Sequence, residues 1–350
     1  MTVGDRRNFL TSTLTSLGVA MFASSRDLGA ALAQTTGSGN PHRIDIHHHF
    51  APPAWVTEVK GRPLLNPANT AWTPEKSIED MDQGGVAAAI ISITNPGLWF
   101  GDKEVTRRLA RACNDYAAKL MHDYPTRFGL FAAMPMPDVD NTLKEIEYAL
   151  DTLKADGIGL FTSYGDVWLG NQAFIPVMEE LNRRKALVHV HPTAANCCRN
   201  LIPDVSPGIA EYGFDTTRAI LGVTFSGDAA RFPDIRFIWS HAGGTLPFLA
   251  GRIEGASRRL KDREKRLPNG IDYEFKRFYY DTAGAGNVGA MVSLMKLVNV
   301  SQVLFGTDFP PGSTSLAMAN SLAHLGLFSK SDLRAIERGN AVRLLPRFNS

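Results

Sequence analysis

Cysteine is scarce in this sequence. The 350 residues contain only Cys113, Cys197 and Cys198, and none of them forms a C-x-x-C pair. This number and spacing indicate neither a disulfide framework nor a zinc knuckle. A bond between the adjacent Cys197 and Cys198 would close a strained ring, so we expect both to be reduced.

An excess of charge of one sign is also missing. The chain has 37 lysines and arginines against 35 aspartates and glutamates, a formal net charge of +2, and the two signs are interspersed. This balance argues against a surface for nucleic acid or for an anionic membrane. Low-complexity runs and obvious repeats are absent too. With 44% hydrophobic residues, the chain can build one large domain or two small ones.

The first 40 residues differ from the rest. Arg6 and Arg7 precede a weakly apolar stretch that extends to about Ala23, and Ala31-Leu32-Ala33 offers a cleavage site between small residues. We predict a twin-arginine export signal and linker over residues 1–40, and hence a periplasmic or exported protein. The alternative is an ordinary disordered N-terminus on a cytoplasmic protein. The apolar stretch is too short to cross a membrane, so we expect no membrane span in the mature chain.

From residue 41 to residue 350, short apolar strands alternate with segments of helical periodicity. The predicted strands are Arg43–His49, Val86–Ile93, Phe128–Met136, Gly157–Thr162, Ala186–His191, Ile235–His241, Phe278–Thr282 and Val303–Asp308. The predicted helices are Lys103–Asp123, Asn141–Ala155, Gln172–Arg184, Thr216–Ala230, Leu246–Lys265 and Val288–Leu297. Strands separated by helices pair in parallel, and eight such units favour a closed (β/α)8 barrel of the TIM type over an open doubly wound sheet. The insertion Ala51–Gly84 follows the first strand and would lie on the active-site face as a lid.

Histidine and aspartate stand where four of these strands end. The residues are His47 and His49, then His191, His241 and Asp308. Because barrel strands converge at their carboxyl ends, these five side chains can share one cavity. Three imidazoles and a carboxylate suit Zn²⁺, and also Mn²⁺ or Fe²⁺. His241 is either a further ligand or a general base beside the metal, and we prefer the base.

Three neighbouring polar residues have other expected roles. In a pleated strand His48 points away from His47 and His49, so we expect it to pack under a helix. His189 lies one layer deeper than His191, and Asp45 one layer below His47. Both are candidates to orient a metal ligand by hydrogen bonding.

The glycine pattern "GAGNVG", residues 284–289, matches the dinucleotide-binding motif G-x-G-x-x-G by letter only. A dinucleotide fingerprint should open an early βαβ unit, whereas this one follows the seventh strand. We interpret it as a tight turn from strand to helix that can cradle a substrate oxygen. The sequence has no G-x-S-x-G elbow, Walker loop or H-E-x-x-H helix.

Four stretches together resemble the amidohydrolase-related proteins of the aminocarboxymuconate-semialdehyde decarboxylase type. They are "IDIHHHF", "VHVHPT", "IWSHAGGTLPFLAGR" and "FGTDFP", and the resemblance runs from about Arg43 to the C-terminus. Within this family, "ITNPGLWFGD", "GLFTSYGDVWLG" and "HPTAANCC" look most similar to 6-methylsalicylate decarboxylase-like proteins.

The resemblance implies a distorted (β/α)8 barrel with one divalent ion, with Zn²⁺ the first choice and Mn²⁺ the second. By motif, the metal ligands would be His47, His49, His191 and Asp308, and His241 the catalytic histidine. Arg252 stands where the family reaches the substrate carboxylate from a neighbouring subunit, which implies a homodimer. The alternative for Arg252 is a helix-surface arginine. Dinuclear relatives carry a lysine at the end of the fourth strand, where this chain reads "GIGLFTSY", so we expect one metal.

These features favour non-oxidative decarboxylation of a small aromatic or unsaturated carboxylic acid, such as a salicylate. The metal would bind the carboxylate and the ortho-hydroxyl while His241 or Asp308 manages the proton. The sequence does not separate these two, and in the aminocarboxymuconate pattern His241 would instead activate a water. Aromatic side chains in the loops after strands two and four are candidates to stack on the substrate ring, with ordinary loop packing the alternative. They are Trp99, Phe100, Tyr164 and Trp168.

Two other functions stay open on sequence grounds. A metal-dependent hydrolase, for instance a lactonase, would use the same ligands and His241 to activate water. A non-catalytic binding protein for a metal or an aromatic acid has no evident use for His241.

Overall fold

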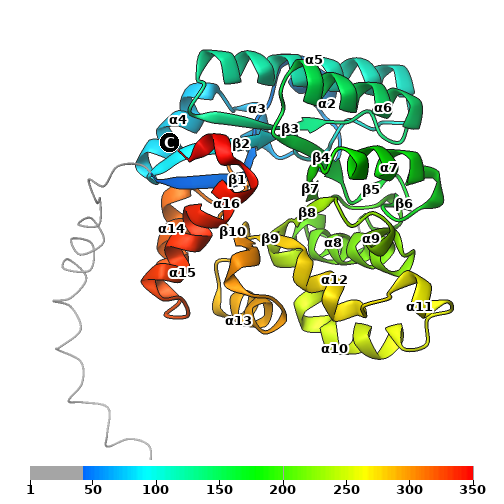
Figure 1. Ribbon diagram of the computed structural model, residues 1–350. Helices are drawn as coiled ribbons and strands as arrows, with labels where there is room; N and C mark the ends of the chain where they lie inside the picture. Colours follow the sequence, from blue (N-terminus) through cyan, green and yellow to red (C-terminus); the bar gives the residue numbers. More distant parts are fainter. Residues whose placement is uncertain (1–41, 200, 350) are drawn as a thin grey trace, which may run out of the picture. The chain divides into compact units, whose positions relative to one another are not determined.

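The computed structural model describes residues 42–199 and 201–349 (Figure 1). Eight parallel strands form one sheet in the order β1-β2-β3-β4-β7-β8-β9-β10. Their bounds are β1 Arg43–His49, β2 Val86–Ser92, β3 Phe128–Ala133, β4 Gly157–Phe161, β7 Leu187–His191, β8 Arg236–Trp239, β9 Tyr279–Asp281 and β10 Val303–Leu304. Every predicted strand is therefore confirmed, most with slightly earlier ends. The predicted export signal lies outside the described residues.

Hydrogen bonds between β1 and the segment after β10 join the two edges of the sheet. The amide of Ile46 donates to the carbonyl of Phe305, and the amide of Asp308 donates to the carbonyl of His47 at 2.7 Å. His48 and Phe309 also form a parallel bridge. A sheet whose first and last strands meet is a barrel, so the predicted (β/α)8 architecture is confirmed.

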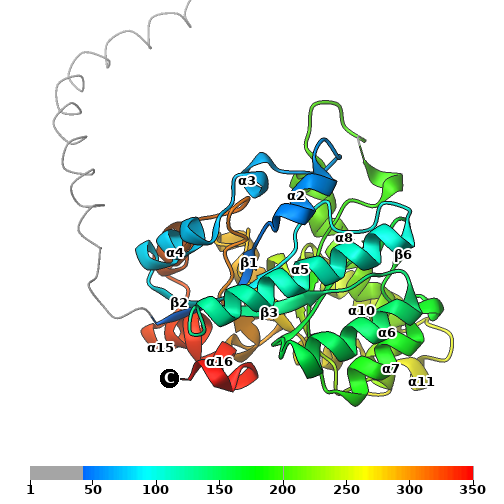
Figure 2. The same ribbon diagram turned by 90° about the horizontal axis from the view of Figure 1, so that it is seen from above.

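Helices surround the barrel, and Figure 2 shows the long helix α5 lying along β3. The helices are α2 Pro53–Val59, α3 Pro67–Thr70, α4 Pro74–Gln83, α5 Lys103–Asp123, α6 Val139–Glu147, α7 Ile175–Arg183, α8 Pro207–Phe225, α9 Asp228–Arg231, α10 Leu246–Ser257, α11 Arg263–Arg266, α12 Ile271–Arg277, α13 Val288–Leu297, α14 Ser315–His324, α15 Lys330–Arg334 and α16 Asn340–Leu344. None of the described helices is long and apolar enough to span a membrane.

Four predicted helices differ in extent from the observed ones. The segment Gln172–Arg184 begins with a 3-10 turn, Gln172–Phe174, and α7 follows from Ile175 to Arg183. The segment Asn141–Ala155 is α6 followed by a π-helical turn, Tyr148–Thr152. The segment Thr216–Ala230 begins earlier, at Pro207, and is broken before α9 by Gly227, whose φ is 92°. The segment Leu246–Lys265 ends at Ser257. Periodicity alone misses such breaks because apolar residues continue through them.

Apolar side chains fill the amino-terminal half of the barrel. One buried cluster joins Ile44 and Ile46 of β1 to Phe131 of β3, Ile238 of β8 and residues of the last helix, α16. In Figure 1 this helix lies beside β1, at the end where the chain enters the barrel. Because the amino-terminal end of the barrel is filled with apolar side chains, polar side chains of the barrel interior are expected at the carboxyl ends of the strands.

Candidate metal centre and active site

Four side chains from three parts of the chain meet at the carboxyl end of the barrel. They are His47, His49, His191 and Asp308, and one ligand atom from each lies within 4.8 Å of all the others. The Nε2 atoms of His47 and His49 are 3.2 Å apart. Oδ1 of Asp308 lies 2.8 Å from Nε2 of His49, 3.4 Å from that of His47 and 3.9 Å from that of His191. The structure thus brings together the four residues predicted to bind the metal.

The outer ring nitrogens of these histidines are held by the protein. Nδ1 of His49 lies 3.2 Å from the carbonyl of Ser92, and Nδ1 of His191 lies 2.8 Å from that of Pro192. Since a carbonyl only accepts, Nδ1 carries the proton and Nε2 offers its lone pair to the centre. Burial lowers the pKa of His49 to about 4 and that of His191 to about 3, so both rings are neutral at pH 7.

His191 supplies the test of whether a cation fits. Its Nε2 is buried and has no hydrogen-bond partner among the described residues. A buried polar atom without a partner costs on the order of 1–3 kcal/mol, and native proteins rarely leave one so. Three neutral imidazole nitrogens and one carboxylate are a suitable donor set for a divalent ion. The residues therefore fit the group that the sequence predicts.

Asp281, at the end of β9, connects the ligands to the rest of the site, and the sequence analysis did not single it out. Its Oδ2 accepts from Nδ1 of His47 at 2.8 Å, and its Oδ1 accepts from the amide of His241 at 2.8 Å. Nε2 of His189 lies 3.3 Å from the same carboxylate, as expected for a residue that orients a ligand. In the sequence, the strand "YYDTA" ends near an aspartate, as the strand "FGTD" does. This similarity could have identified Asp281 as a site residue.

Charges around His47 favour its protonated form when no cation is bound. Burial acts to lower the pKa of His47, but the carboxylates of Asp281 and Asp308 outweigh it and raise the pKa to about 10. Although its own burial works in the opposite direction, the facing histidines hold the pKa of Asp308 well below its usual range. The centre is therefore an anionic pocket that attracts positive charge.

His241 faces the centre from outside the four-ligand cluster. It follows β8, its Nε2 lies 3.4 Å from Oδ2 of Asp308, and its side chain is 16% exposed. Its φ of 55° is left-handed, a backbone conformation that the hydrogen bond from its amide to Asp281 supports. Gly284 lies against the ring, because a Cβ at this position would come within 3.3 Å of Cδ2 of His241. The glycine pattern "GAGNVG" is thus a turn between β9 and α13, as predicted.

A bulge in β1 sets the faces of the histidines. From Asp45 to His48 three steps of β1 oppose two steps of β2, Ala89 to Ile91. Such a bulge interrupts the alternation of side chains. Asp45 contacts Nδ1 of His48 at 3.0 Å and accepts from the backbone amide of His47 at 3.0 Å. It therefore does hydrogen-bond to a residue of the four-ligand cluster, as predicted, but through the backbone and not through the ring. His48 reaches Ser77 of α4 at 2.8 Å, packed under a helix as expected.

A cavity of about 1070 Å³ opens above the centre. His191, His241 and Asp308 lie on its floor, and the insertion after β1 contributes Leu65 and Asn69 to its wall. The predicted lid segment therefore does line the mouth of the barrel.

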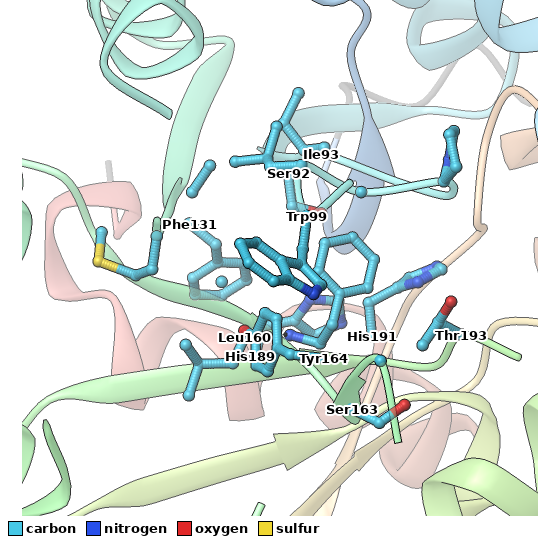
Figure 3. A pocket seen from close by; sticks show the side chains of 18 of the residues that line it. Ser92, Ile93, Trp99, Phe131, Leu160, Ser163, Tyr164, His189, His191 and Thr193 are labelled. Carbon is cyan, nitrogen blue, oxygen red and sulfur yellow. Dashed lines mark hydrogen bonds between the residues drawn. The ribbon is translucent and has the colours of Figure 1, made fainter. Parts of the chain in front are cut away.

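A narrower chamber, lined in part by aromatic rings and called here the aromatic chamber, adjoins this cavity beside His191. Figure 3 shows Trp99, Tyr164 and His191 around it. Phe161, the last residue of β4, packs against His191 with the ring centroids 5.8 Å apart. The Tyr164 hydroxyl accepts a hydrogen bond from the amide of Phe161 at 3.0 Å, so Tyr164 offers its ring to the chamber.

The other two predicted aromatic residues have structural partners. Phe100 lies under the guanidinium of Arg62, 3.8 Å from its ring centroid, and outside the chamber. Nε1 of Trp168 donates to Asp215 at 2.6 Å. For these two residues ordinary loop packing accounts for the observed contacts.

Arg252 and the two adjacent cysteines require separate comment. Arg252 is exposed on α10 and lines none of the described cavities near the centre, so it does not reach its own subunit's site. Cys197 and Cys198 form a disulfide bond, and the expectation that both are reduced was wrong. The adjacent residues sit in a single turn, Asn196–Cys198, where the two side chains meet without a distant partner.

Two curated fungal proteins are similar over most of their length. Decarboxylase yanB of Aspergillus niger is 40% identical over 326 residues, 87% of this chain and 88% of the relative. The 6-methylsalicylic acid decarboxylase of Penicillium expansum is 36% identical over 316 residues, 87% of this chain and 96% of the relative.

Solved structures agree with the fold. An amidohydrolase II structure superposes with a TM-score of 0.81 and 27% identity over 87% of this chain and 99% of that one. A dihydroxybenzoic acid decarboxylase from Polaromonas, with bound manganese, gives a TM-score of 0.75 and 21% identity over 89% and 98% of the two chains. The amidohydrolase family model matches residues 44–347. The chain therefore belongs to the amidohydrolase family.

Proposed function

We propose that this protein is a metal-dependent, non-oxidative decarboxylase of a small aromatic carboxylic acid of the 6-methylsalicylate type. One observation carries the proposal: His241 faces Asp308 of the four-ligand cluster without being part of it, at the floor of an open cavity. A binding protein needs ligands, whereas an enzyme also needs a group that moves a proton. The relatives that are decarboxylases support the choice of reaction.

The ion that we propose is a single Zn²⁺, with Mn²⁺ as the second choice. His47, His49, His191 and Asp308 would hold it, and three nitrogens with one oxygen are a common set for zinc. When bound, the ion supplies Lewis acidity toward the oxygens of the substrate's carboxylate and ortho-hydroxyl.

The protein's own residues would perform the proton transfer. The acid, His241 in our assignment and Asp308 as the alternative, delivers a proton to the ring carbon that bears the carboxylate. The bond from that carbon to the carboxylate then breaks, its electron pair restores the aromatic ring, and CO2 leaves. Trp99 and Tyr164 would hold the ring by stacking, with Tyr164 fixed by its bond to the Phe161 amide.

We further propose a homodimer. Helix α10 contacts both α13 and α8, and each of the three exposes an apolar side chain: Phe248 of α10 is 86% exposed, Val288 of α13 57% and Phe214 of α8 43%. Exposed apolar groups on adjoining elements are typical of protein interfaces. Arg252 lies on α10 too and would reach a partner's cavity from there. Light scattering of the purified protein measures the mass, and a monomer at micromolar concentration would contradict the dimer.

Export through the twin-arginine pathway remains our proposal for residues 1–40. Replacing Arg6 and Arg7 by lysine should retain the protein in the cytoplasm, as fractionation of the host cells would show. Equal distribution of both forms would remove the proposal.

CO2 release tests the reaction. Purified, metal-loaded protein is incubated with a panel of ortho-hydroxybenzoates that includes 6-methylsalicylate, beside a sample treated with chelator. We expect release that the chelator abolishes. No release from any member of the panel, with bound metal verified, would overturn the decarboxylase, and turnover of a parallel panel of lactones would then identify a hydrolase.

A further inference from the structure

Arg199 occupies a junction between the cavities at the barrel mouth. It lines the large cavity above the metal centre, the aromatic chamber beside His191, and a third cavity near Trp99. Among the described residues that line the large cavity, it is the one arginine or lysine. A substrate that enters toward the centre therefore passes this guanidinium.

Most of the hydrogen-bonding capacity of Arg199 is uncommitted. Its Nε donates to the carbonyl of Ala194 at 2.9 Å, and no carboxylate in the described part of the chain pairs with its terminal nitrogens. The nearby Arg62 contrasts with it: Nη2 of Arg62 donates to Glu58 at 2.6 Å, and its guanidinium covers the ring of Phe100. An arginine whose terminal guanidinium nitrogens have no carboxylate partner is suited to bind a carboxylate ligand through two parallel hydrogen bonds.

The loop after β7 holds Arg199 in place. The amide of Cys197 donates to Oδ1 of Asp166 at 3.0 Å, and Cys197 is bonded to Cys198, the residue before Arg199. The bond from Nε of Arg199 to Ala194 closes the same loop. A side chain that is already held in place loses less conformational entropy when it binds a ligand, and this favours binding.

The charges in the wall of the large cavity favour an anion-binding role for Arg199. Asp308 is the one carboxylate among the described residues that line the large cavity, and in the metal-loaded protein the ion would compensate its charge. Arg199 is then the one guanidinium or ammonium group of the described lining that an organic anion meets on its way in. Tyr212, also in the cavity wall, lies within the electrostatic influence of both groups: after the effect of burial, Asp308 raises the pKa of its phenol and Arg199 lowers it.

We propose that Arg199 binds the carboxylate of the aromatic acid substrate, from within the same subunit. This inference rests on the proposed function, since it assigns the anion-binding group of that same site. It also gives a consequence for turnover. Decarboxylation removes the group that Arg199 holds, so the phenol product loses this contact and leaves more readily than the acid.

Binding rather than turnover tests the proposal. Calorimetry would measure the affinity of the metal-loaded His241→Asn protein, in which turnover should be slowed, for 6-methylsalicylate and for 3-methylphenol, its product without the carboxylate. The arginine variants are compared in this same background. We expect Arg199→Gln to weaken binding of the acid by about 10- to 100-fold, the range of a charge-assisted hydrogen-bonded pair, and to change binding of the phenol less than about twofold. Arg199→Lys should lie between the two.

Two further variants make the result specific. Arg231→Gln removes a surface arginine that pairs with Glu179, and it should bind both compounds like the unaltered protein. Arg252→Gln tests the rival assignment. Our proposal would be overturned if Arg252→Gln lost binding of the acid and Arg199→Gln did not. Equal weakening of acid and phenol binding in Arg199→Gln would also overturn it. So would a failure of the protein with Arg199 intact to bind the acid. Arg199-dependent binding without CO2 release would instead overturn the decarboxylase and leave the anion site standing.

Discussion

Nδ1 of His47 lies 2.8 Å from Oδ2 of Asp281, and both side chains are fully buried. The same carboxylate accepts from the backbone of His241 through its other oxygen, at 2.8 Å. One residue thus fixes the His47 ring of the four-ligand cluster and the backbone of His241. The two parts of the site are coupled through β9, a strand that contributes no member of the cluster.

We therefore expect Asp281→Asn to loosen the metal centre. An asparagine places an NH2 group opposite Nδ1–H of His47 or the amide of His241, so one donor loses its acceptor. Loss of such an orienting carboxylate lowers metal affinity by about 10- to 100-fold. Competition with a chromogenic chelator would measure the affinity.

The matched control for this variant is Asp156→Asn. Asp156 is also buried, with its side chain 5% exposed, and it accepts from the amide of Leu130 and pairs with Arg347, away from the metal cluster. This variant should lose stability and keep its metal affinity. Equal loss of metal from both variants would show that Asp281 acts only through overall stability.

The cluster could be predicted because its residues stand at the ends of strands that the sequence shows clearly. His49, His191 and Asp308 each stand at the end of an apolar run, His47 lies two residues before His49, and parallel strands bring such positions together. The bulge in β1 could not be predicted, because an extra residue in a strand depends on the neighbouring strand and on the bonds of Asp45 to Thr307.

Residues outside the conspicuous histidine motifs were harder to place. Asp281 ends strand β9 shortly before the glycine pattern, and apart from this position at a strand end nothing in the sequence distinguishes it from a structural aspartate. Arg199 follows the adjacent cysteines, and its position among the cavities depends on the path of the loop after β7. Loop geometry leaves no periodic signal in a sequence. Arg252 could be assigned to a helix, α10, but not to a site, because a helix surface faces either solvent or a partner.

Gly306 is expected to be essential to the fit of the centre. A Cβ added to it would lie 2.8 Å from Cβ of His47 and 3.1 Å from Cβ of Asp281. Neither atom can turn away, because both are bonded to strand backbones. Gly306→Ala should lower the free energy of unfolding by about 1–3 kcal/mol, the usual cost of overpacking, and weaken metal binding. Thermal unfolding and metal titration would measure the two effects.

Gly255→Ala provides the comparison for Gly306→Ala. Gly255 is exposed on α10, and a Cβ there would meet nothing within 4 Å. Because alanine favours the helix by up to about 1 kcal/mol over glycine, this variant should be slightly more stable. If Gly306→Ala were as stable as Gly255→Ala and bound metal as well, the close approach of Gly306 to His47 would not constrain the residue at this position.

His241→Asn should separate binding from chemistry. Since His241 is not part of the four-ligand cluster, metal content should stay at the level of the unaltered protein. Turnover should fall by about 10²- to 10⁴-fold, the contribution typical of a general acid or base. The exposed His324 on α14 offers a control, because His324→Asn should change neither quantity. Unchanged turnover in His241→Asn would refute its role, and loss of metal would make it a ligand.

Metal removal should destabilise the folded protein. Three imidazoles and a carboxylate are buried around one point, and Nε2 of His191 has no hydrogen-bond partner in the described structure. Without a cation this burial costs desolvation free energy, and a bound cation would recover it. A ligand at a hundred times its Kd stabilises the native state by about 2.7 kcal/mol, so chelation should lower the Tm by several degrees. His191→Ala lacks one ligand and should unfold at the same temperature with and without chelator. A chelator effect of equal size in both proteins would show that the ion acts elsewhere, and no effect in the unaltered protein would show that the cluster is stable without it.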